Sequence, residues 1–513
     1  MSKLVTFLYF VATLCMIDTA KILGVFPTPS VSHQVVFRVL IQELVRRGHE
    51  VVVITTDPAF PQGEAPTNLT EIDLHDISYN FIKDFTLKVL DDDVFVYGKT
   101  SSLINMEKQL QQFFNVLEVQ VKSEPMQNFM KEKKRFDILL IEAYARPAIA
   151  YSHIFKAPVI LVSSFGATIE NLEAFGAPTH PMLYPIPYRC RLYNLSLWDK
   201  LREYYYHMQY IWMHEENESF NNELVQRMFG PNVPYVSELI ENVDMLFLNV
   251  HPIWMSNQPV PPGIVFMGGL HQKPIKELPK DLKSYLDSSK NGVIYVSFGT
   301  NVHPIMFPAE PLKIITKVLS ELPYDILFKW NDDELPGRTK NIKISKWLPQ
   351  SDLLRHPKVK AFIMQGGLQS TDEAITAGVP LVCIPMLGDQ WYNAEKYVQL
   401  NIGLKLDLYK LTKTELRNAI ETVISNSSYR ENIVRLRAVM SDQPQSPLER
   451  AVWWVEHVLR HGGARHLRTP AANMPWTEYY ELELVLILLS CLLISLSIGL
   501  LIVSKLWRYV SQF

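Results

Sequence analysis

The sequence predicts an α/β protein with two domains, each built on a parallel sheet, and one membrane-spanning helix near its end. Three observations indicate this fold class. A strand–helix–strand pattern occupies residues 21–55, a second one occupies residues 359–385, and residues 484–503 carry no charge. The chain has 513 residues, which is too long for a single ordinary hydrophobic core, so two domains are expected.

The first pattern begins with the apolar run KILGVF and ends with the apolar run EVVVIT. Between them, Val36, Val39, Leu40 and Leu44 recur at helical spacing, and Gly48 follows as a C-cap residue. This is the opening unit of a parallel sheet with a right-handed crossover. It lacks the GxGxxG fingerprint, so a nicotinamide or flavin site is not indicated.

Composition narrows the class of protein. Hydrophobic residues make up 48% and charged residues 20% of the chain, as in a globular protein with a membrane segment. The formal net charge of −3 gives no reason to expect a nucleic-acid partner. Cys190 and Cys383 are the cysteines of the folded part, and the sequence leaves open one bridge or two free thiols.

The segments at both ends of the chain have the features of membrane-crossing sequences. Residues 1–20 have the charged start, apolar core and small final residue of a secretory leader. Residues 484–503 would span about 30 Å as a helix, and Lys505 and Arg508 follow them, which places the tail in the cytosol. The result is a single-pass type I protein whose body is lumenal. Four glycosylation sequons fit that placement: Asn68, Asn194, Asn217 and Asn426.

The stretch 347–390 is the most informative part of the chain. The apolar run VKAFIM ends at Gly366 and Gly367, the helix-compatible segment LQSTDEAITAG follows, and VPLVCIP closes the unit. The start of such a helix presents free N–H groups and a positive dipole end that bind phosphate well. The glycine turn alone is equally compatible with any βαβ unit.

The sequence motifs QGGLQSTDEAI and GDQWYN in this stretch resemble the signature of the UDP-glycosyltransferases, in the form found in insects. The resemblance covers residues 21–510 and implies the GT-B fold, in which two Rossmann-like domains enclose the active site. It implies a UDP-sugar as co-substrate, no separate cofactor and no metal. It places UDP-sugar contacts at Ser297, Gly299, Thr300, Lys329, Trp347, Gln350, Gln365, Gly366, Gly367, Gln369, Ser370, Glu373, Asp389 and Gln390.

The resemblance also implies individual roles. Trp347 would stack on uracil and Gln350 would bind the nucleoside, whereas Gln365 would contact the diphosphate. Glu373 would hold the ribose hydroxyls, and Asp389 and Gln390 would hold the sugar.

Gln365 and Lys329 differ from the residues usual in the family, and Glu373 has an alternative role. Relatives usually have His at Gln365, and a Gln side chain donates an N–H but cannot become cationic. Ser370 and Glu373 also fit a capping box, in which Glu373 would cap its own helix. Lys329 replaces an Arg of relatives and is compatible with phosphate binding or with a surface lysine.

In the first half, FPTPSVSHQ resembles the segment that carries the family's catalytic base, which would be His33. Taken alone, a histidine at a helix start is also compatible with a cap or a surface residue. Glu142 ends the strand DILLIE, where the family has an acid that orients the histidine. A carboxylate there is equally compatible with capping the next helix. By residue type, Asp91, Asp92 and Asp93 read as a solvated charge run, so we expect no metal site.

We expect an acceptor-binding domain at residues 21–260, a Pro/Gly-rich linker at residues 261–290 and a UDP-sugar-binding domain at residues 291–466. The juxtamembrane segment is 467–483, the membrane helix 484–503 and the tail 504–513. Family members reside in the endoplasmic reticulum, although the tail lacks a dilysine signal. The sequence leaves the oligomeric state open, a homo-oligomer included.

We therefore expect inverting, metal-independent transfer of a hexose, and of glucose in particular, to a hydroxyl of a small lipophilic acceptor. The aromatic-rich segment 165–210 would line the acceptor cleft. Glucuronosyl relatives have Arg where this chain has Asn249, and Asn cannot pair with the glucuronate carboxylate. The alternatives are glucuronosyl transfer and a non-catalytic membrane glycoprotein that binds lipophilic ligands.

Overall fold

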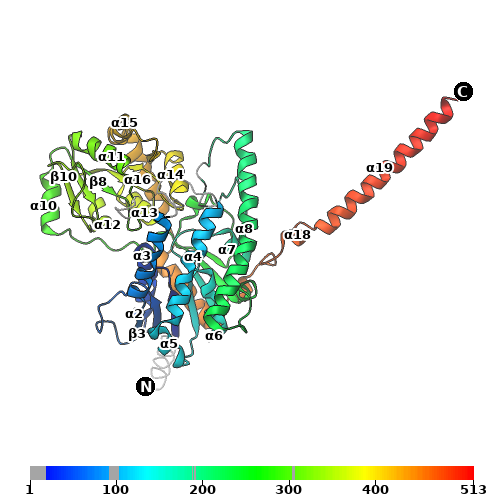
Figure 1. Ribbon diagram of the computed structural model, residues 1–513, viewed down its shortest axis with the longest axis horizontal. Helices are drawn as coiled ribbons and strands as arrows, with labels where there is room; N and C mark the ends of the chain where they lie inside the picture. Colours follow the sequence, from blue (N-terminus) through cyan, green and yellow to red (C-terminus); the bar gives the residue numbers. More distant parts are fainter. Residues whose placement is uncertain are drawn as a thin grey trace, which may run out of the picture.

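A computed structural model of the chain describes residues 19–91, 103–185, 187, 189, 192–302 and 307–512. The leader except its last two residues, Asp92, Asp93 and Cys190 lie outside these residues. Two α/β lobes form the body, and one long helix projects away from it (Figure 1). Every strand pair within the two sheets is parallel, which confirms the predicted architecture.

The first sheet has seven strands in the order β3-β2-β1-β4-β5-β6-β7. Its central strands are fully buried runs of Val, Ile and Leu, as expected for a parallel sheet covered on both faces. The strands are β1 (Lys21–Phe26), β2 (Glu50–Thr55), β3 (Leu69–Asp73), β4 (Ile138–Glu142), β5 (Val159–Ser163), β6 (Val243–Leu248) and β7 (Ile264–Phe266).

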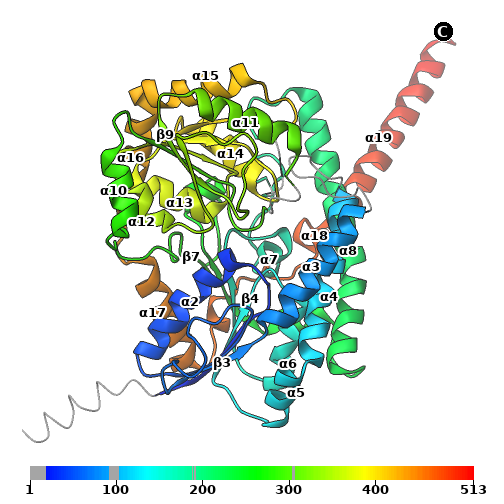
Figure 2. The ribbon, with the colours of Figure 1, turned by 60° about the vertical axis from the view of Figure 1, so that its left-hand side comes forward.

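Helices cover both faces of this sheet (Figure 2). They are α2 (Val31–Arg46), α3 (His75–Asp91), α4 (Leu103–Lys122), α5 (Glu124–Lys131), α6 (Tyr151–Phe155), α7 (Ile169–Ala174), α8 (Leu197–Phe229) and α9 (Val236–Leu239). Short 3₁₀ turns lie at Arg146–Ala150, Ile240–Asn242 and Pro252–Met255.

The second sheet has six strands in the order β10-β9-β8-β11-β12-β13. Its strands are β8 (Val293–Ser297), β9 (Asp325–Lys329), β10 (Ile342–Ser345), β11 (Val359–Met364), β12 (Leu381–Cys383) and β13 (Gly403–Lys405). Its helices are α10 (Lys280–Ser288), α11 (Ala309–Glu321), α12 (Gln350–Leu354), α13 (Leu368–Ala377), α14 (Gln390–Gln399), α15 (Lys413–Ser425) and α16 (Ser427–Ser441). Cys383 is a free, buried thiol in β12.

The first domain extends further along the chain than residue 260. β7 pairs with β6 although it falls within residues 261–290, which we expected to be linker. Helix α17 (Pro447–His461) also returns to the first domain, where it lies along α2 (Figure 2). Val452, Val455 and Val458 are buried in the same cluster as Phe37 of α2. The apolar face of α17 accounts for this return, because its buried residues belong to a core cluster of the first domain.

The last segment leads away from the body. α18 (Trp476–Tyr479) is followed by α19 (Leu482–Val510), whose most apolar window has a mean hydropathy of 2.9. This helix is long and apolar enough to cross a membrane, and none of that window is buried in the protein. The preceding segment is fixed to the first domain, because the Asn473 N–H donates to the Glu173 carbonyl at 3.2 Å.

Candidate active site between the two domains

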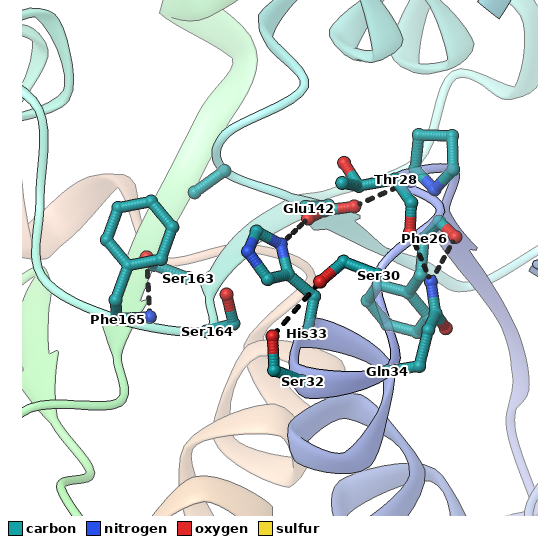
Figure 3. A network of polar contacts seen from close by, with 12 residues as sticks. Phe26, Thr28, Ser30, Ser32, His33, Gln34, Glu142, Ser163, Ser164 and Phe165 are labelled. Carbon is teal, nitrogen blue, oxygen red and sulfur yellow. Dashed lines mark hydrogen bonds and ion pairs between the residues drawn. The ribbon is translucent and has the colours of Figure 1, made fainter. Parts of the chain in front are cut away.

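His33 and Glu142 form a hydrogen-bonded pair at the carboxyl edge of the first sheet (Figure 3). Glu142 ends β4, and His33 lies in the first turn of α2, which follows the neighbouring strand β1. The imidazole Nδ1 lies 2.7 Å from Glu142 Oε1, and the Thr28 backbone N–H donates to Oε2 at 3.1 Å. Glu142 is 1% exposed. Both carboxylate oxygens are therefore occupied, which fixes the imidazole and leaves its Nε2 to accept a proton.

The turn that carries His33 is held in place by Gln34. Its amide donates to the backbone carbonyls of Phe26 and Thr28 (Figure 3), and its carbonyl accepts from the Thr55 hydroxyl. Gln34 is 1% exposed, so these bonds form in a dry environment where losing one is costly. Sequence reasoning did not identify this residue. A buried polar side chain next to a functional turn is the feature that marks it.

Aromatic rings surround the exposed side of His33. The Phe165 ring lies 5.6 Å and the Tyr144 ring 6.1 Å from the imidazole, both edge-on. Phe165 also lines a cavity that continues between the domains. This cavity is walled by Phe165, Gly166, Ala167, Ile169, Leu172, Thr179, Tyr184, Pro185, Pro187, Val250, Trp254, Met255, Gln258, Leu368, Asp389, Tyr392 and Asn393.

The cavity agrees in part with the expected acceptor cleft. Its walls come from the predicted aromatic-rich segment, but also from the segment Val250–Gln258 and from the second domain. Sequence reasoning missed Trp254, which is 2% exposed in the turn that follows β6. Most of the lining is apolar, with a few polar groups, as is typical of a site for a small lipophilic molecule.

In the second domain, two glycine turns approach each other. Gly299 has φ +78°, and a Cβ added there would lie 2.3 Å from Gln365 Nε2. Gly366 has φ +100°, and a Cβ there would meet the Cys383 sulfur and the Gln390 backbone. Gly367 is the N-cap residue of α13 and directly precedes its first helical residue. The close approach requires glycine at both turns and exposes the helix start to a ligand.

Gln365 and the neighbouring side chains lie between these turns. Gln365 is 7% exposed, and its Oε1 has no hydrogen-bond partner among the described residues. Ser297 is buried and its hydroxyl accepts from the Gly299 N–H at 3.3 Å, whereas Thr300 is exposed. An orphan polar atom at this depth is unusual and indicates room for a ligand group.

Lys329 belongs to the same glycine turn. Its ammonium donates to the Gly299 carbonyl at 2.8 Å, and burial lowers its pKa. The ammonium also lies 6.0 Å from the centre of the Trp347 ring. Trp347 itself is 65% exposed, so its face is available for stacking. A partly buried lysine fixed to the turn differs from a freely solvated surface lysine.

Gln350, Ser370 and Glu373 form one hydrogen-bonded cluster. The Gln350 amide donates to Ser370 Oγ at 2.9 Å and to Glu373 Oε2 at 2.7 Å, and its carbonyl accepts from Tyr295. Burial raises the pKa of Glu373. The capping-box alternative for Glu373 is wrong. Because α13 begins after Gly367, Glu373 lies beyond the first turn and bonds Gln350 instead.

Asp389 is the N-cap residue of α14 and Gln390 is the first residue of that helix; Asp389 lines the cavity between the domains. Burial raises the pKa of Asp389 to about 6, and the hydrogen bond from the Asn393 amide partly offsets this effect. Gln390 Oε1 accepts from the N–H groups of Met386 and Leu387. That carbonyl therefore organises the loop before α14.

Among the residues that the structure describes, the Gln369 side chain bonds the first domain and not a neighbour within the second. Its amide donates across the domain boundary to the Ser164 carbonyl at 2.9 Å. Ser164 also accepts from Asn249, and the Gln369 carbonyl contacts His271 Nε2 at 3.2 Å. Gln369 thus connects the two domains.

Asn249 belongs to the same network. It is fully buried, and its amide and carbonyl bond Ser164, His271 and the Leu270 N–H. Burial lowers the pKa of His271 to about 4, which keeps this ring neutral. Asn249 therefore has a structural role here and bears on donor choice only by lacking a charge.

The four sequon residues differ in accessibility. Asn194 and Asn426 are exposed, and Asn217 is half-buried beside Gln111. The Asn68 amide donates to both the Val45 and His49 carbonyls, so a glycan there would displace one of these bonds. In the described part of the chain, no group of three or more His, Cys, Asp or Glu side chains is placed to hold a metal ion.

Comparison with solved structures agrees with the fold. The chain superposes on the spinosyn forosaminyltransferase SpnP with a TM-score of 0.58 at 16% identity, covering 86% of this chain and 100% of that one. It superposes on Arabidopsis thaliana UGT89C1, solved with UDP-L-rhamnose, with a TM-score of 0.57 at 15% identity, covering 86% and 99%. At these identities the likeness establishes the GT-B fold.

Comparison with curated sequences gives the family. The ecdysteroid UDP-glucosyltransferase of Lymantria dispar multicapsid nuclear polyhedrosis virus is 39% identical over 93% of this chain and 94% of its own length. UDP-glucosyltransferase 2 of Dactylopius coccus is 30% identical over 92% and 90%. Human UDP-glucuronosyltransferase 2B17 is 30% identical over 91% and 89%. The family model for UDP-glucoronosyl and UDP-glucosyl transferases matches residues 20–512, and the chain belongs to this family of UDP-sugar-dependent transferases.

Proposed function

We propose that this UDP-glycosyltransferase moves glucose from UDP-glucose to a hydroxyl of a small lipophilic acceptor, with His33 as general base and Glu142 as its positioning partner. The observation that carries the proposal is the His33–Glu142 pair, whose atoms lie 2.7 Å apart and whose imidazole packs against Phe165, a residue that lines the apolar cavity. An alcohol or phenol is a poor nucleophile until its proton leaves. A positioned base contributes about 10² to 10⁴ in rate.

The chemistry follows from the placement of the groups. The acceptor hydroxyl would lie against Phe165 and donate its proton to His33 Nε2 as its oxygen attacks the anomeric carbon. Glu142 would stabilise the imidazolium that forms, because its carboxylate already accepts the Nδ1 proton. UDP leaves from the opposite face of the sugar, so the configuration inverts.

The second domain would stabilise the charge that develops on UDP. The start of α13 offers backbone N–H groups, and Lys329 brings an ammonium to the Gly299 turn. Trp347 would stack on uracil, Gln350 would bind the base and Glu373 the ribose hydroxyls. Asp389 and Gln390 would hold the sugar hydroxyls. These groups supply electrostatic stabilisation by themselves, and metal-free transfer stays a prediction.

The uncharged hydrogen-bonding network of Asn249 and the names of two relatives support glucose as the donor sugar. Asn249 and its partners present no cation to a glucuronate carboxylate. Two of the relatives compared are named glucosyltransferases, at 39% and 30% identity. Glucuronosyl transfer is the second candidate, because a human relative of that name is 30% identical.

The apolar helix α19 supports a membrane anchor, and we propose that the catalytic domains are lumenal, in the endoplasmic reticulum. Exposed Asn426 provides a direct test, because Asn426→Gln would remove one glycan and increase mobility on a gel. Mobility that does not change after either this substitution or glycosidase treatment would contradict a lumenal body.

The donor test uses membranes that express the full chain, with equal UDP-glucose and UDP-glucuronate and a panel of phenols and steroids. Ecdysteroids belong in the panel because of the viral relatives' name. We expect glucoside product only, resistant to EDTA and lost in His33→Ala. Glucuronide product would overturn the donor, and EDTA sensitivity would overturn metal independence. Full activity in His33→Ala would overturn His33 as the base, whereas no transfer by the parent from either donor would favour the binding role.

A further inference from the structure

Asn393 connects three parts of the active site through one side chain. It lies one turn into α14 and is 2% exposed. Its amide donates to the Gly366 carbonyl at 2.8 Å and to Asp389 Oδ2 at 2.8 Å. Its carbonyl accepts from the Trp254 indole N–H at 2.7 Å. The glycine turn, the sugar-facing carboxylate and the acceptor-cavity wall therefore all meet at this residue.

The chemistry of the partners fixes the orientation of the amide. A backbone carbonyl and a carboxylate accept hydrogen bonds, whereas an indole N–H donates. Only one placement of the Asn393 oxygen and nitrogen satisfies all three. Aspartate, serine or leucine of similar size could satisfy at most part of this set, so the position requires an amide.

A second bond ties the same wall to α14. The Tyr392 hydroxyl donates to the Trp254 backbone carbonyl at 2.7 Å, and both residues line the cavity with Asn393 and Asp389. Trp254 comes from the first domain and Asp389 from the second. Asn393 is thus hydrogen-bonded to both the acceptor wall and Asp389.

We propose that Asn393 is a positioning residue that orients Asp389 toward the donor sugar and couples this orientation to the acceptor wall at Trp254. The inference rests on the proposed function, since it takes Asp389 to hold the sugar. It adds a residue for which we expected no site role from sequence.

The geometry has an electrostatic consequence. Burial raises the pKa of Asp389, and the Asn393 hydrogen bond is the largest influence that lowers it. Among the described residues, the titratable groups that interact with Asp389 are His33 from α2, Cys383 from β12 and Tyr397 from α14. Removing the Asn393 amide would therefore raise the pKa of Asp389 further, and the carboxylate would protonate at a higher pH.

The test measures kcat/KM against pH for the full-length enzyme and for Asn393→Leu. We expect a loss of about 10-fold or more near neutral pH, because a hydrogen bond to a charged group is removed. We also expect the acid limb of the profile to move to higher pH. Asn341→Leu is the matched control, because it removes two amide bonds, to the Leu319 and Tyr324 carbonyls, far from the site. Its acid limb should not move.

A double-variant cycle separates positioning from simple support of the fold. In an Asp389→Asn background, Asn393→Leu should cost little more activity, since the carboxylate that it orients is gone. Independent, multiplying losses together with an unchanged acid limb would overturn the proposal.

If Asn393→Leu does not fold, Trp254→Phe gives a second route. It removes the indole N–H and part of the ring but keeps an apolar wall, and it should shift the acid limb in the same direction by a smaller amount. An unchanged acid limb in folded Trp254→Phe would overturn the coupling. Absence of sugar transfer by the parent enzyme would instead mean that the proposed function fails, so the two failures are distinguishable.

Discussion

The His33–Glu142 pair of the first domain and the Gln350–Glu373 cluster of the second domain are both hydrogen-bonded, but in different ways. Glu142 bonds a backbone N–H and the imidazole, and His33 Nε2 stays available. Gln350 and Glu373 instead bond each other. The first arrangement is already suited to its proposed reaction. In the second, the ribose and uracil contacts proposed above would compete with the Gln350–Glu373 bond, which would lower the donor affinity.

The largest expected effect comes from breaking the first pair. In Glu142→Gln, the amide carbonyl would accept the Thr28 N–H, and the amide N–H would donate to His33 Nδ1. This arrangement forces the ring proton onto Nε2, the atom that must accept the acceptor's proton. We expect kcat to fall by at least about 10². Measured donor KM and thermal stability should stay near those of the parent, and an equal loss in kcat and stability would contradict the account.

A loss on the donor side should be smaller. Glu373→Gln removes the charge that accepts from Gln350 and that would hold the ribose hydroxyls. We expect the KM for UDP-glucose and the inhibition constant of UDP to rise together by about 10-fold, as for a hydrogen bond to a charged group. The control is Glu431→Gln, at an exposed position of α16. A fall in kcat with unchanged KM would assign Glu373 to the chemical step instead.

The two glycine turns can be tested through stability. In Gly299→Ala, the new Cβ meets Gln365 Nε2 at 2.3 Å at a φ of +78°. We expect a loss of about 1–3 kcal/mol in unfolding free energy, together with weaker UDP binding. Gly63→Ala has a similar φ of +83° but no atom within 4 Å, so it isolates the backbone strain from the clash. Equal losses in both variants would mean that the contact with Gln365 is unimportant.

The smallest expected effect concerns Asp372, one residue before Glu373. It is 3% exposed, its Oδ2 has no partner among the described residues, and burial with the Glu373 charge raises its pKa to about 8. A carboxyl with a raised native pKa binds extra protons when folded, so it lowers stability as pH rises toward that value.

Replacing this carboxyl removes the titration. Asp372→Asn should therefore gain about 1 kcal/mol over the parent at pH 8, and less at pH 5. Thermal unfolding at the two pH values checks this prediction. A gain that is the same at both values would show that Asp372 does not titrate in this range.

The sequence was sufficient for the parts of the fold that depend on local pattern. Apolar runs bounded by glycine turns gave the two parallel sheets, and charge-free length gave α19. The His33–Glu142 pairing was expected from the family resemblance, and the structure places both residues at the carboxyl ends of the neighbouring parallel strands β1 and β4.

What escaped the sequence depends on side-chain direction and on contacts between distant segments. Gln369 lies within the donor motif, yet its amide reaches Ser164, 205 positions earlier in the chain. The apolar face of α17 is evident in the sequence, and in the family that the chain resembles the last helices cross back over the first domain, but the packing against α2 in particular is not evident. Asn393 lies within the family motif, and the residues around it in the sequence do not indicate its hydrogen-bond partners. Its three partners are apparent only in the folded structure.

The most direct test of the central claim compares the parent and His33→Ala on a series of phenols and alcohols whose hydroxyl pKa values differ. A base matters most for the least acidic hydroxyl. The account predicts that the loss in kcat/KM is about 10² to 10⁴ for simple alcohols and shrinks steadily toward acidic phenols, which ionise without help. A loss that is the same for every acceptor would contradict His33 as the base that removes the acceptor proton.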